Sequence, residues 1–242
     1  MSIPGRSPMS SDELTGWLVA ACRRLTDSKD ELTGLDAAAG DGDLGVTVAS
    51  GAAGVAAALG GLPSGSTPAE VFRAAGAAFA RGNPSSFAAL SGAGLLAAAQ
   101  AAEDASAGDA SAGDASAAGT SAAAPGADGA STVSRDSLVA ALRAAAGRIA
   151  QRGRAGLGQR TVLDALVPSI EALRTAPPGM AAGLDAMVTA ARSGVAATTQ
   201  MTAARGRAAW VGDRSRGVAD GGATAYLRFL EALTETIPAA VR

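Results

Sequence analysis

Apolar residues recur at helical spacing along almost the whole chain of 242 residues, and an alternation with a period of two is nowhere sustained. Alanine and the 32 glycines dominate, whereas aromatic residues make up only 3% of the chain, a composition that favours helices packed closely through small side chains. We therefore predict an all-α fold, a bundle of about eight helices. The predicted helical segments are 12–28, 31–38, 45–60, 67–80, 86–102, 136–152, 160–174, 179–200 and 220–237.

The length is suited to one domain, which we predict to span residues 1–242. One segment, 103–134, differs from its surroundings because it repeats DASAG in tandem and contains no large apolar side chain. Such a segment buries too little surface to offset the entropy lost on ordering. We expect it to be a flexible low-complexity insertion between two helices.

Several classes of function are excluded by what the chain lacks. It contains no histidine, so Ser-His-Asp catalysis, histidine-ligated metal and phosphohistidine chemistry on this chain are eliminated. Its single cysteine, Cys22, excludes an intramolecular disulfide and is expected in the core. The net charge of −2 predicts no long-range attraction to nucleic acid or to an anionic membrane. No apolar run reaches membrane-spanning length and no signal peptide is evident, so we expect a soluble cytoplasmic protein.

Three aspartates, Asp36, Asp41 and Asp43, lie close together in the glycine-rich stretch LDAAAGDGDLG, which contains no basic residue. Clustered carboxylates repel one another, and a hard divalent cation with oxygen ligands is the usual compensation. The stretch lacks the third acidic ligand, the central glycine and the closing glutamate of a calcium-binding EF-hand loop. Spacing alone leaves three options open: a magnesium site, a calcium site and a solvated Asp-Gly turn.

Two further stretches are candidates for binding an anion. SGAG (residues 91–94) precedes an apolar run and is expected to offer backbone N–H groups at a helix start. The stretch 204–225 is rich in glycine and arginine, and its guanidinium groups match phosphate oxygens in geometry. A plain turn and a solvated surface loop are the respective alternatives.

Four stretches resemble, in the same order, motifs of the nucleotide-binding L-type domain of dihydroxyacetone kinases. LTGLDAAAGDGDLG resembles the family's Gly-Asp-Gly-Asp-x-Gly loop with an aspartate five residues upstream, and LSGAG is similar to its Gly-Ala-Ser-Gly phosphate loop. GLGQRTVLDALVP resembles the Gly-Asp-Lys-Thr-Met-x-Asp segment. GRAAWVGDRSRGVADGGAT resembles the Gly-Arg-Ala-Ser-Tyr-x-Gly…Asp-Pro-Gly-Ala ending. The resemblance covers roughly residues 14–235, with the repeat tract as an insertion.

The resemblance implies a closed barrel of about eight amphipathic helices, with the nucleotide site in loops at one end. It implies that Asp36, Asp41 and Asp43 hold two Mg²⁺ ions. Arg207 is implied to be catalytic, as a permanently charged donor to the phosphates. The residues implied to contact ADP or ATP are Leu44, Gly45, Val46, Thr47, Leu90, Ser91, Gly153, Val162, Arg207, Asp220 and Gly221.

The sequence departs from the family pattern at several of these positions. Leu44 stands where many members have histidine, and Thr47 where they have asparagine, although threonine is similar to the single-chain, ATP-using kinases of the family. The remaining replacements are Gln159 and Arg160 for Asp-Lys, Val162 for methionine and Gly221 for proline. The metal site is therefore better supported than the contacts to the base, and the nucleotide preference stays open.

The resemblance also implies that the chain is half of an enzyme. In the family a histidine of a K-type domain holds the triose covalently, and this chain has no histidine. We expect a subunit that transfers a phosphoryl group to dihydroxyacetone, or a similar short ketose, on a separate K-type subunit. The expected donor is bound ADP recharged by a phosphotransferase-system protein.

Alternatives to this role remain. One is an ATP-using kinase subunit for another ketose, and another is a non-catalytic nucleotide-binding regulator of a transcription factor. A homodimer is also left open.

Overall fold

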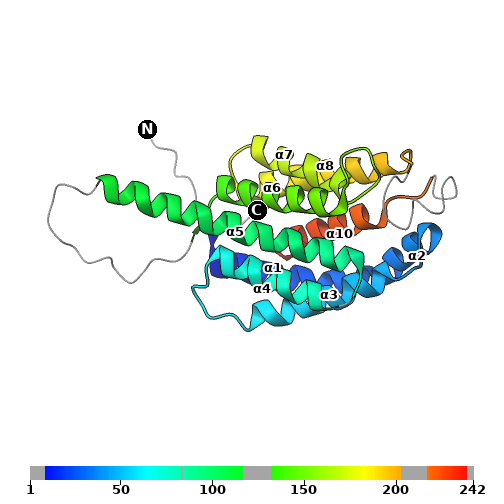
Figure 1. Cartoon of the computed structure of the whole chain (residues 1–242), viewed down its shortest axis with the longest axis horizontal. Coiled ribbons are helices and arrows are strands. Elements are labelled where there is room, and N and C mark those ends of the chain that lie inside the picture. Colours follow the sequence, from blue (N-terminus) through cyan, green and yellow to red (C-terminus); the bar gives the residue numbers. More distant parts are fainter. Residues whose placement is uncertain (1–8, 83, 117–131, 203–216, 239–242) are drawn as a thin grey trace.

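The computed structural model describes residues 9–82, 84–116, 132–202 and 217–238, and helices dominate these residues (Figure 1). The all-α prediction is confirmed. In chain order the elements are β1 (Met9–Ser10), α1 (Ser11–Leu25), the 3-10 helix η1 (Thr26–Ser28), α2 (Lys29–Ala39), α3 (Leu44–Gly60), α4 (Pro68–Gly82), α5 (Ser86–Ser116), β2 (Thr132–Val133), α6 (Arg135–Gly153), α7 (Leu163–Thr175), α8 (Met180–Thr198) and α10 (Gly221–Thr236).

Local capping sets where helices begin. Ser10 accepts a hydrogen bond from the backbone N–H of Glu13, whose carboxylate accepts one from the backbone N–H of Ser10, so α1 starts with a complete capping box. Thr67 and Glu70 form the same reciprocal pair before α4, with N···O distances of 3.2 and 2.8 Å. Both starts follow from the sequence, because each pair combines Ser or Thr with Glu three residues later.

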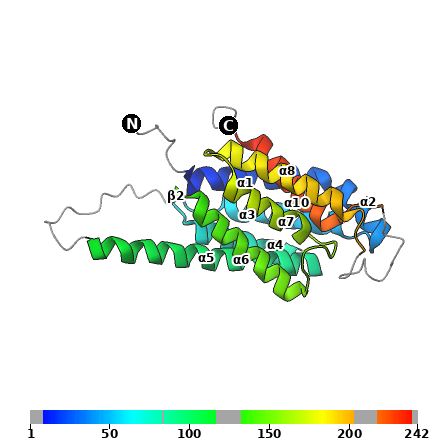
Figure 2. The same cartoon turned by 90° about the horizontal axis from the view of Figure 1, so that it is seen from above.

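The helices pack side by side along their length (Figures 1 and 2), and the contacts between eight of the described helices form a closed ring. Around the ring the order is α1, α3, α4, α5, α6, α7, α8 and α10, and α10 packs back against α1. The short α2 lies at one end, against α3 and α10. Neighbours along the chain are therefore neighbours in space, and the first and last helices close the structure.

The core fills the inside of the ring in two main parts. One is formed largely by α7, α8 and α10, with Leu166, Ile170 and Leu230 almost fully buried. The other joins α1, α2, α3 and α4 and includes Cys22, which is buried as predicted. No described helix combines the length and the apolar character that crossing a membrane requires.

Small residues allow close helix packing. Ala98, Ala99 and Ala141 fill the contact between α5 and its neighbours. Gly194 of α8 lies so close to α7 that a Cβ atom there would stand 2.1 Å from the carbonyl oxygen of Asp164. A bulkier residue at such a point would push the two helices apart.

Helix α5 is longer than the predicted segment 86–102. It continues to Ser116 and runs past the ends of the other helices (Figures 1 and 2). About a third of the extension is alanine, which has the highest helix propensity, and the extension propagates from turns that already exist. The sequence did not predict the short antiparallel sheet in which β1 pairs with β2, with Met9 opposite Val133. The flexible insertion over 103–134 stays a prediction, because 117–131 lie outside the described residues.

Substituting Gly194→Ala tests the close packing of α7 and α8. The added methyl would meet backbone atoms of Asp164 and Ala165, which cannot rotate away, so we expect a loss of about 2–3 kcal/mol in the free energy of unfolding. Gly54→Ala in α3 is the matched control, because its Cβ would lie at an ordinary 3.6 Å from the carbonyl oxygen of Ala78. We expect the control to gain up to about 1 kcal/mol from helix propensity. Equal effects in urea unfolding would contradict this account.

Candidate functional site

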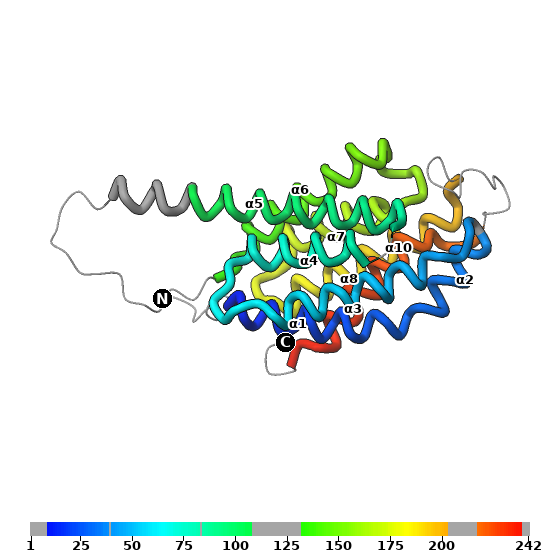
Figure 3. The backbone as a smooth tube through the Cα atoms, turned by 60° about the horizontal axis from the view of Figure 1, so that its bottom comes forward, coloured from blue at the N-terminus to red at the C-terminus, as the bar shows by residue number. Residues whose placement is uncertain are grey.

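The starts of α3, α5, α7 and α10 gather at one end of the ring, the right-hand end in Figures 1 and 3. The helices that precede them among the described elements, α2, α4, α6 and α8, end there. The first turn of a helix carries a partial positive charge and N–H groups with no partner inside the helix. This end is therefore suited to an anion.

The three aspartates of the α2–α3 region come together at this end. Asp36 lies in α2, while Asp41 and Asp43 lie in the loop before α3, and one carboxylate oxygen of each falls within 4.8 Å of the others. Asp36 and Asp43 are half-buried, whereas Asp41 is exposed. The three side chains therefore lie close together, and their binding of a metal ion stays a prediction.

Glycines let the loop fold around Asp36. A Cβ atom at Gly40 would stand 2.6 Å from the Oδ1 atom of Asp36, so the chain can pass this carboxylate only without a side chain. Gly42, between the other two aspartates, has a φ of +78°, a left-handed conformation that glycine adopts without strain. The Gly-Asp-Gly-Asp pattern is thus explained locally.

The electrostatics of the cluster favour a cation. Partial burial, and then the negative charge of Asp36, raise the pKa of the Asp43 carboxyl. Asp36 also accepts a hydrogen bond from the backbone N–H of Leu44 at 3.2 Å, which links the cluster to the first turn of α3. Closely spaced carboxylates at a solvent-accessible loop are the oxygen ligands that hard divalent ions prefer, so these residues fit Mg²⁺.

The side chains in the first turn of α3 differ in exposure. Leu44 and Thr47 are buried, and the Thr47 hydroxyl has no hydrogen-bond partner within the described part of the chain, whereas Val46 is 47% exposed. Leu44 faces the start of α10, because a Cβ atom at Gly221 would lie 2.6 Å from its Cδ2 atom. Two segments almost 180 residues apart, both predicted to contact the nucleotide, therefore lie side by side.

The predicted position of SGAG at a helix start is wrong. Helix α5 begins at Ser86, and the side chain of Ser85 accepts a hydrogen bond from the backbone N–H of Ala88 at 3.1 Å. The backbone N–H of Ser91 is therefore inside the helix, and the apolar run that seemed to follow the helix start is its middle. Leu90, however, is adjacent to Gly153 at the end of α6, with 3.7 Å between its Cδ1 atom and an ideal Cβ of the glycine. These two predicted contacts come together.

Asp220 caps α10. Its carboxylate accepts a hydrogen bond from the backbone N–H of Ala223 at 2.7 Å, and its own N–H donates to the hydroxyl of Thr198 at the end of α8. Burial raises the pKa of Asp220 to about 6, although the hydrogen bond from Ala223 and the charge of Arg160 oppose this shift. Val162, the last predicted contact in the described residues, packs against the core just before α7. Arg207 lies outside the described residues.

Sequence reasoning missed a buried polar group beside Asp220. Arg160 is only 2% exposed and donates a hydrogen bond from Nη2 to the carbonyl oxygen of Val218 at 3.0 Å. Asp164 is also buried and accepts hydrogen bonds from the backbone N–H groups of Gly158 and Thr161. Both residues occur in the stretch GLGQRTVLDALVP. Two residues of opposite charge among apolar neighbours were the signal that could have predicted buried polar groups there.

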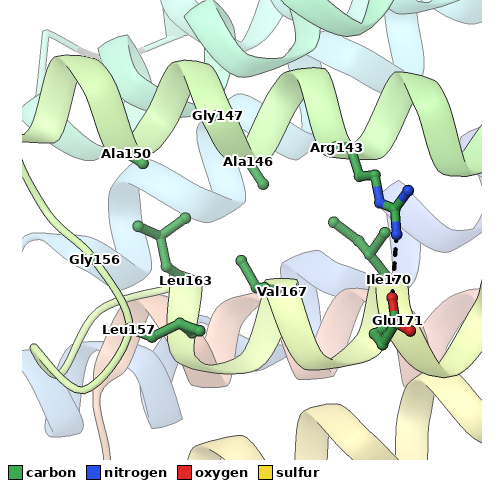
Figure 4. A pocket seen from close by; sticks show the side chains of 10 residues that line it. All are labelled: Arg143, Ala146, Gly147, Ala150, Gly156, Leu157, Leu163, Val167, Ile170 and Glu171. Carbon is green, nitrogen blue, oxygen red and sulfur yellow. Dashed lines mark hydrogen bonds and ion pairs between the residues drawn. The ribbon is translucent and has the colours of Figure 1, made fainter.

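A groove of about 490 Å³ lies between α6 and α7 (Figure 4). Its wall is mostly apolar, and the ion pair between Arg143 and Glu171, with 3.2 Å from nitrogen to oxygen, lies at one end. None of the predicted site residues lines it, so the groove is separate from the carboxylate cluster. The lining residues are Arg143, Ala146, Gly147, Ala150, Gly156, Leu157, Leu163, Val167, Ile170 and Glu171.

Comparisons with known proteins connect this arrangement to one family. A family model described as the DAK2 domain matches residues 38–235. The chain is 31% identical over 105 residues to the PEP-dependent dihydroxyacetone kinase, ADP-binding subunit DhaL, of Escherichia coli, covering 42% of this chain and 50% of that protein. It is 31% identical over 120 residues to the corresponding subunit of dihydroxyacetone kinase 2 of Listeria innocua, covering 48% and 56%. The matched regions span about half the length of these relatives.

The fold is also similar to solved structures. The dihydroxyacetone kinase from C. freundii in complex with AMP-PNP and Mg²⁺ matches with a TM-score of 0.68 and 25% identity, over 98% of this chain and 36% of that one. The native form of that kinase matches with a TM-score of 0.66 and 24% identity, over 98% and 38%. At 24% identity, the similarity to the native form shows a shared fold and nothing more.

The pH dependence of stability tests the environment of Asp220. Because its pKa is raised from 3.8 to about 6, the folded protein binds this proton more tightly than the unfolded chain does, so the stabilisation is complete below about pH 4 and lost as pH rises through 6. We expect the free energy of unfolding of the nucleotide-free protein, relative to Asp220→Asn, to fall by about 2–3 kcal/mol between pH 4 and pH 7.5. Asparagine keeps a capping oxygen, and charges elsewhere cancel in the comparison. If the difference in the free energy of unfolding between the wild type and D220N did not change with pH, the pKa of Asp220 would not be raised.

Proposed function

Because the chain belongs to the DAK2 domain family, we propose that it is the nucleotide- and Mg²⁺-binding subunit of a dihydroxyacetone or similar short-ketose kinase. In this role it transfers a phosphoryl group to a ketose held by a separate K-type subunit. Residues 1–242 would form one L-type domain, with 103–134 as its insertion.

The observation that carries the proposal is the meeting of three carboxylates with two helix starts. Asp36, Asp41 and Asp43 come within 4.8 Å of one another, and Asp36 is hydrogen-bonded to the first N–H of α3. The start of α10 lies directly against Leu44. Carboxylates attract divalent ions and helix starts attract anions, so a nucleotide that carries Mg²⁺ on its phosphates satisfies both.

Each residue has a distinct task in the proposed phosphoryl transfer. The three aspartates would hold two Mg²⁺ ions, and the chemistry that Mg²⁺ supplies when bound is neutralisation of charge on the phosphate oxygens. The first turn of α3, Leu44 to Thr47, and the start of α10 at Asp220 and Gly221 would orient those oxygens through the N–H groups that do not already donate within the protein. Arg207 would add a permanently charged donor. Positioning and charge compensation are most of what this reaction requires of a protein.

The base and ribose would lie where α5 approaches the end of α6. Leu90 and Gly153 are in contact there, Ser91 is the next residue of α5, and Val162 begins the following helix. These side chains offer little hydrogen bonding to the base. We therefore expect packing contacts and backbone groups to hold the base and the ribose.

The names of the relatives support bound ADP that a phosphotransferase-system protein recharges. Both are described as ADP-binding subunits of PEP-dependent kinases. An exchangeable ATP is the alternative donor, and Thr47 is the feature that favours it. A partner must supply the substrate-holding histidine, because the chain contains none.

Substituting Asp43→Asn tests the metal site. The amide removes one charge and keeps the shape, so we expect Mg²⁺-dependent binding of ADP to weaken at least about 100-fold in calorimetric titration. The nucleotide-free variant should be as stable as the wild type or slightly more so, since repulsion from Asp36 is relieved.

Asp185→Asn is the matched control for that experiment. Asp185 is exposed on α8, and its substitution changes the net charge equally. We expect unchanged binding of Mg²⁺ and ADP. If D43N bound Mg²⁺ and ADP as tightly as this control does, Asp43 would not be a metal ligand.

Reconstitution tests the catalytic role. The purified chain is mixed with a K-type subunit, dihydroxyacetone and Mg²⁺, and either ATP or a phosphorylated phosphotransferase-system protein is added. We expect triose phosphate in the relay arm, with ADP retained by the protein throughout. Product only in the ATP arm would assign ATP as the donor. Nucleotide binding without product in either arm would favour the non-catalytic regulator.

A further inference from the structure

Arg160 combines three unusual properties. Its side chain is only 2% exposed, its backbone has a φ of +57°, and its Nε and Nη1 atoms have no hydrogen-bond partner among the described residues. A left-handed backbone is unfavourable for a residue with a side chain, and a buried guanidinium with unpaired N–H groups is costly. Such features persist where the surrounding structure enforces them, and they concentrate at functional sites.

The loop around Arg160 is fixed on both sides. The Asp164 carboxylate accepts hydrogen bonds from the N–H of Gly158 at 2.5 Å and from the N–H of Thr161 at 2.8 Å, which ties the loop to the start of α7. Gly158 itself has a φ of +79°. The side chain of Arg160 is therefore presented from a rigid support and not from a freely moving loop.

From this support Arg160 reaches the segment that leads into α10. Its Nη2 atom donates to the carbonyl oxygen of Val218 at 3.0 Å, two residues before Asp220. Burial raises the pKa of Asp220, and the positive charge of Arg160 acts against that shift, so the two groups are electrostatically coupled. Asp220 in turn caps the first turn of α10 through Ala223.

The contacts made by the start of α10 show why its position matters. Gly221 packs against Leu44, and Gly222 lies against Phe87 near the start of α5, with 3.2 Å from an ideal Cβ to the ring. A small displacement of this turn would move its N–H groups relative to the starts of both α3 and α5. The position of one turn thus affects three of the helix starts at the site.

We propose that Arg160 is a positioning residue, which holds the first turn of α10 in place by joining the α6–α7 loop to Val218 and Asp220. It does not contact the phosphates itself. Its side chain is buried and its charge is coupled to Asp220, so the site gains from it a fixed geometry and not a cation that faces the ligand. Its effect on nucleotide binding rests on the proposed function, whereas its effect on α10 does not.

The first test needs no nucleotide. Hydrogen exchange of the amides of Ala223 and Thr224, which bond to Asp220, reports whether the first turn of α10 stays formed. In Arg160→Met we expect these amides to exchange at least about tenfold faster, while amides in the middle of α10 are unchanged. Unchanged exchange in the first turn would overturn the proposal.

The second test measures affinity for Mg²⁺ and ADP by calorimetry. We expect the dissociation constant to rise at least about tenfold in R160M and to stay within about threefold of the wild type in R160K, whose ammonium group can still donate to the carbonyl oxygen of Val218. Mn²⁺ binding without nucleotide should be unchanged in both. R148M is the matched control, because Arg148 is exposed on α6, and it should bind like the wild type.

The outcomes separate this proposal from the proposed function. A wild type that binds no nucleotide would refute the proposed function, while the hydrogen-exchange result would still decide the role of Arg160. Wild-type affinity in R160M, or an equal loss in R160K, would overturn the positioning role. If R160M does not fold, R160Q replaces it, since glutamine keeps a donor for Val218 without the charge.

Discussion

Close packing of helices at residues without bulky side chains is the constraint on which the rest of the structure depends. Gly194 lets α8 approach the backbone of α7 at Asp164, and Gly221 lets α10 approach Leu44 of α3. Gly45 brings α3 against the backbone of α2 in the same way. These contacts set the spacing of the ring, so that four helix starts converge at one end. Larger residues would widen the ring and separate the loops that form the site.

The site end combines charges of opposite sign in separate places. Three carboxylates cluster before α3, and a buried guanidinium, Arg160, hydrogen-bonds to Val218 just before α10 and is electrostatically coupled to Asp220. The helix starts between them carry partial positive charge. A ligand with negative phosphates and bound divalent ions complements both the carboxylates and the helix starts. A cation alone would complement only the carboxylates, and an anion alone only the helix starts. This balance is the physical argument for a nucleotide with Mg²⁺.

Much of the fold could be predicted because it depends on local signals. Capping residues and helical periodicity located the helices to within a few residues, and Thr67 with Glu70 is the clearest case. The prediction failed where two signals competed. SGAG looked like a helix start because glycine is common in turns, yet Ser85 already caps α5 and Gly92 is needed for close packing against α4. Helix α5 also continues beyond its large apolar residues, because extending a helix that has already formed is easier than starting a new one.

The sequence by itself determined the helical fold class and, through Gly-Asp-Gly-Asp, the local clustering of Asp41 and Asp43. Local spacing is enough there, because the carboxylates are two residues apart in one loop. Only the tertiary structure decided that Leu44 meets Gly221 and that Arg160 is buried beside Asp220. Each of these contacts joins segments far apart in the chain. Their distances depend on how the helices pack around the whole ring, and no local pattern of residues contains that information.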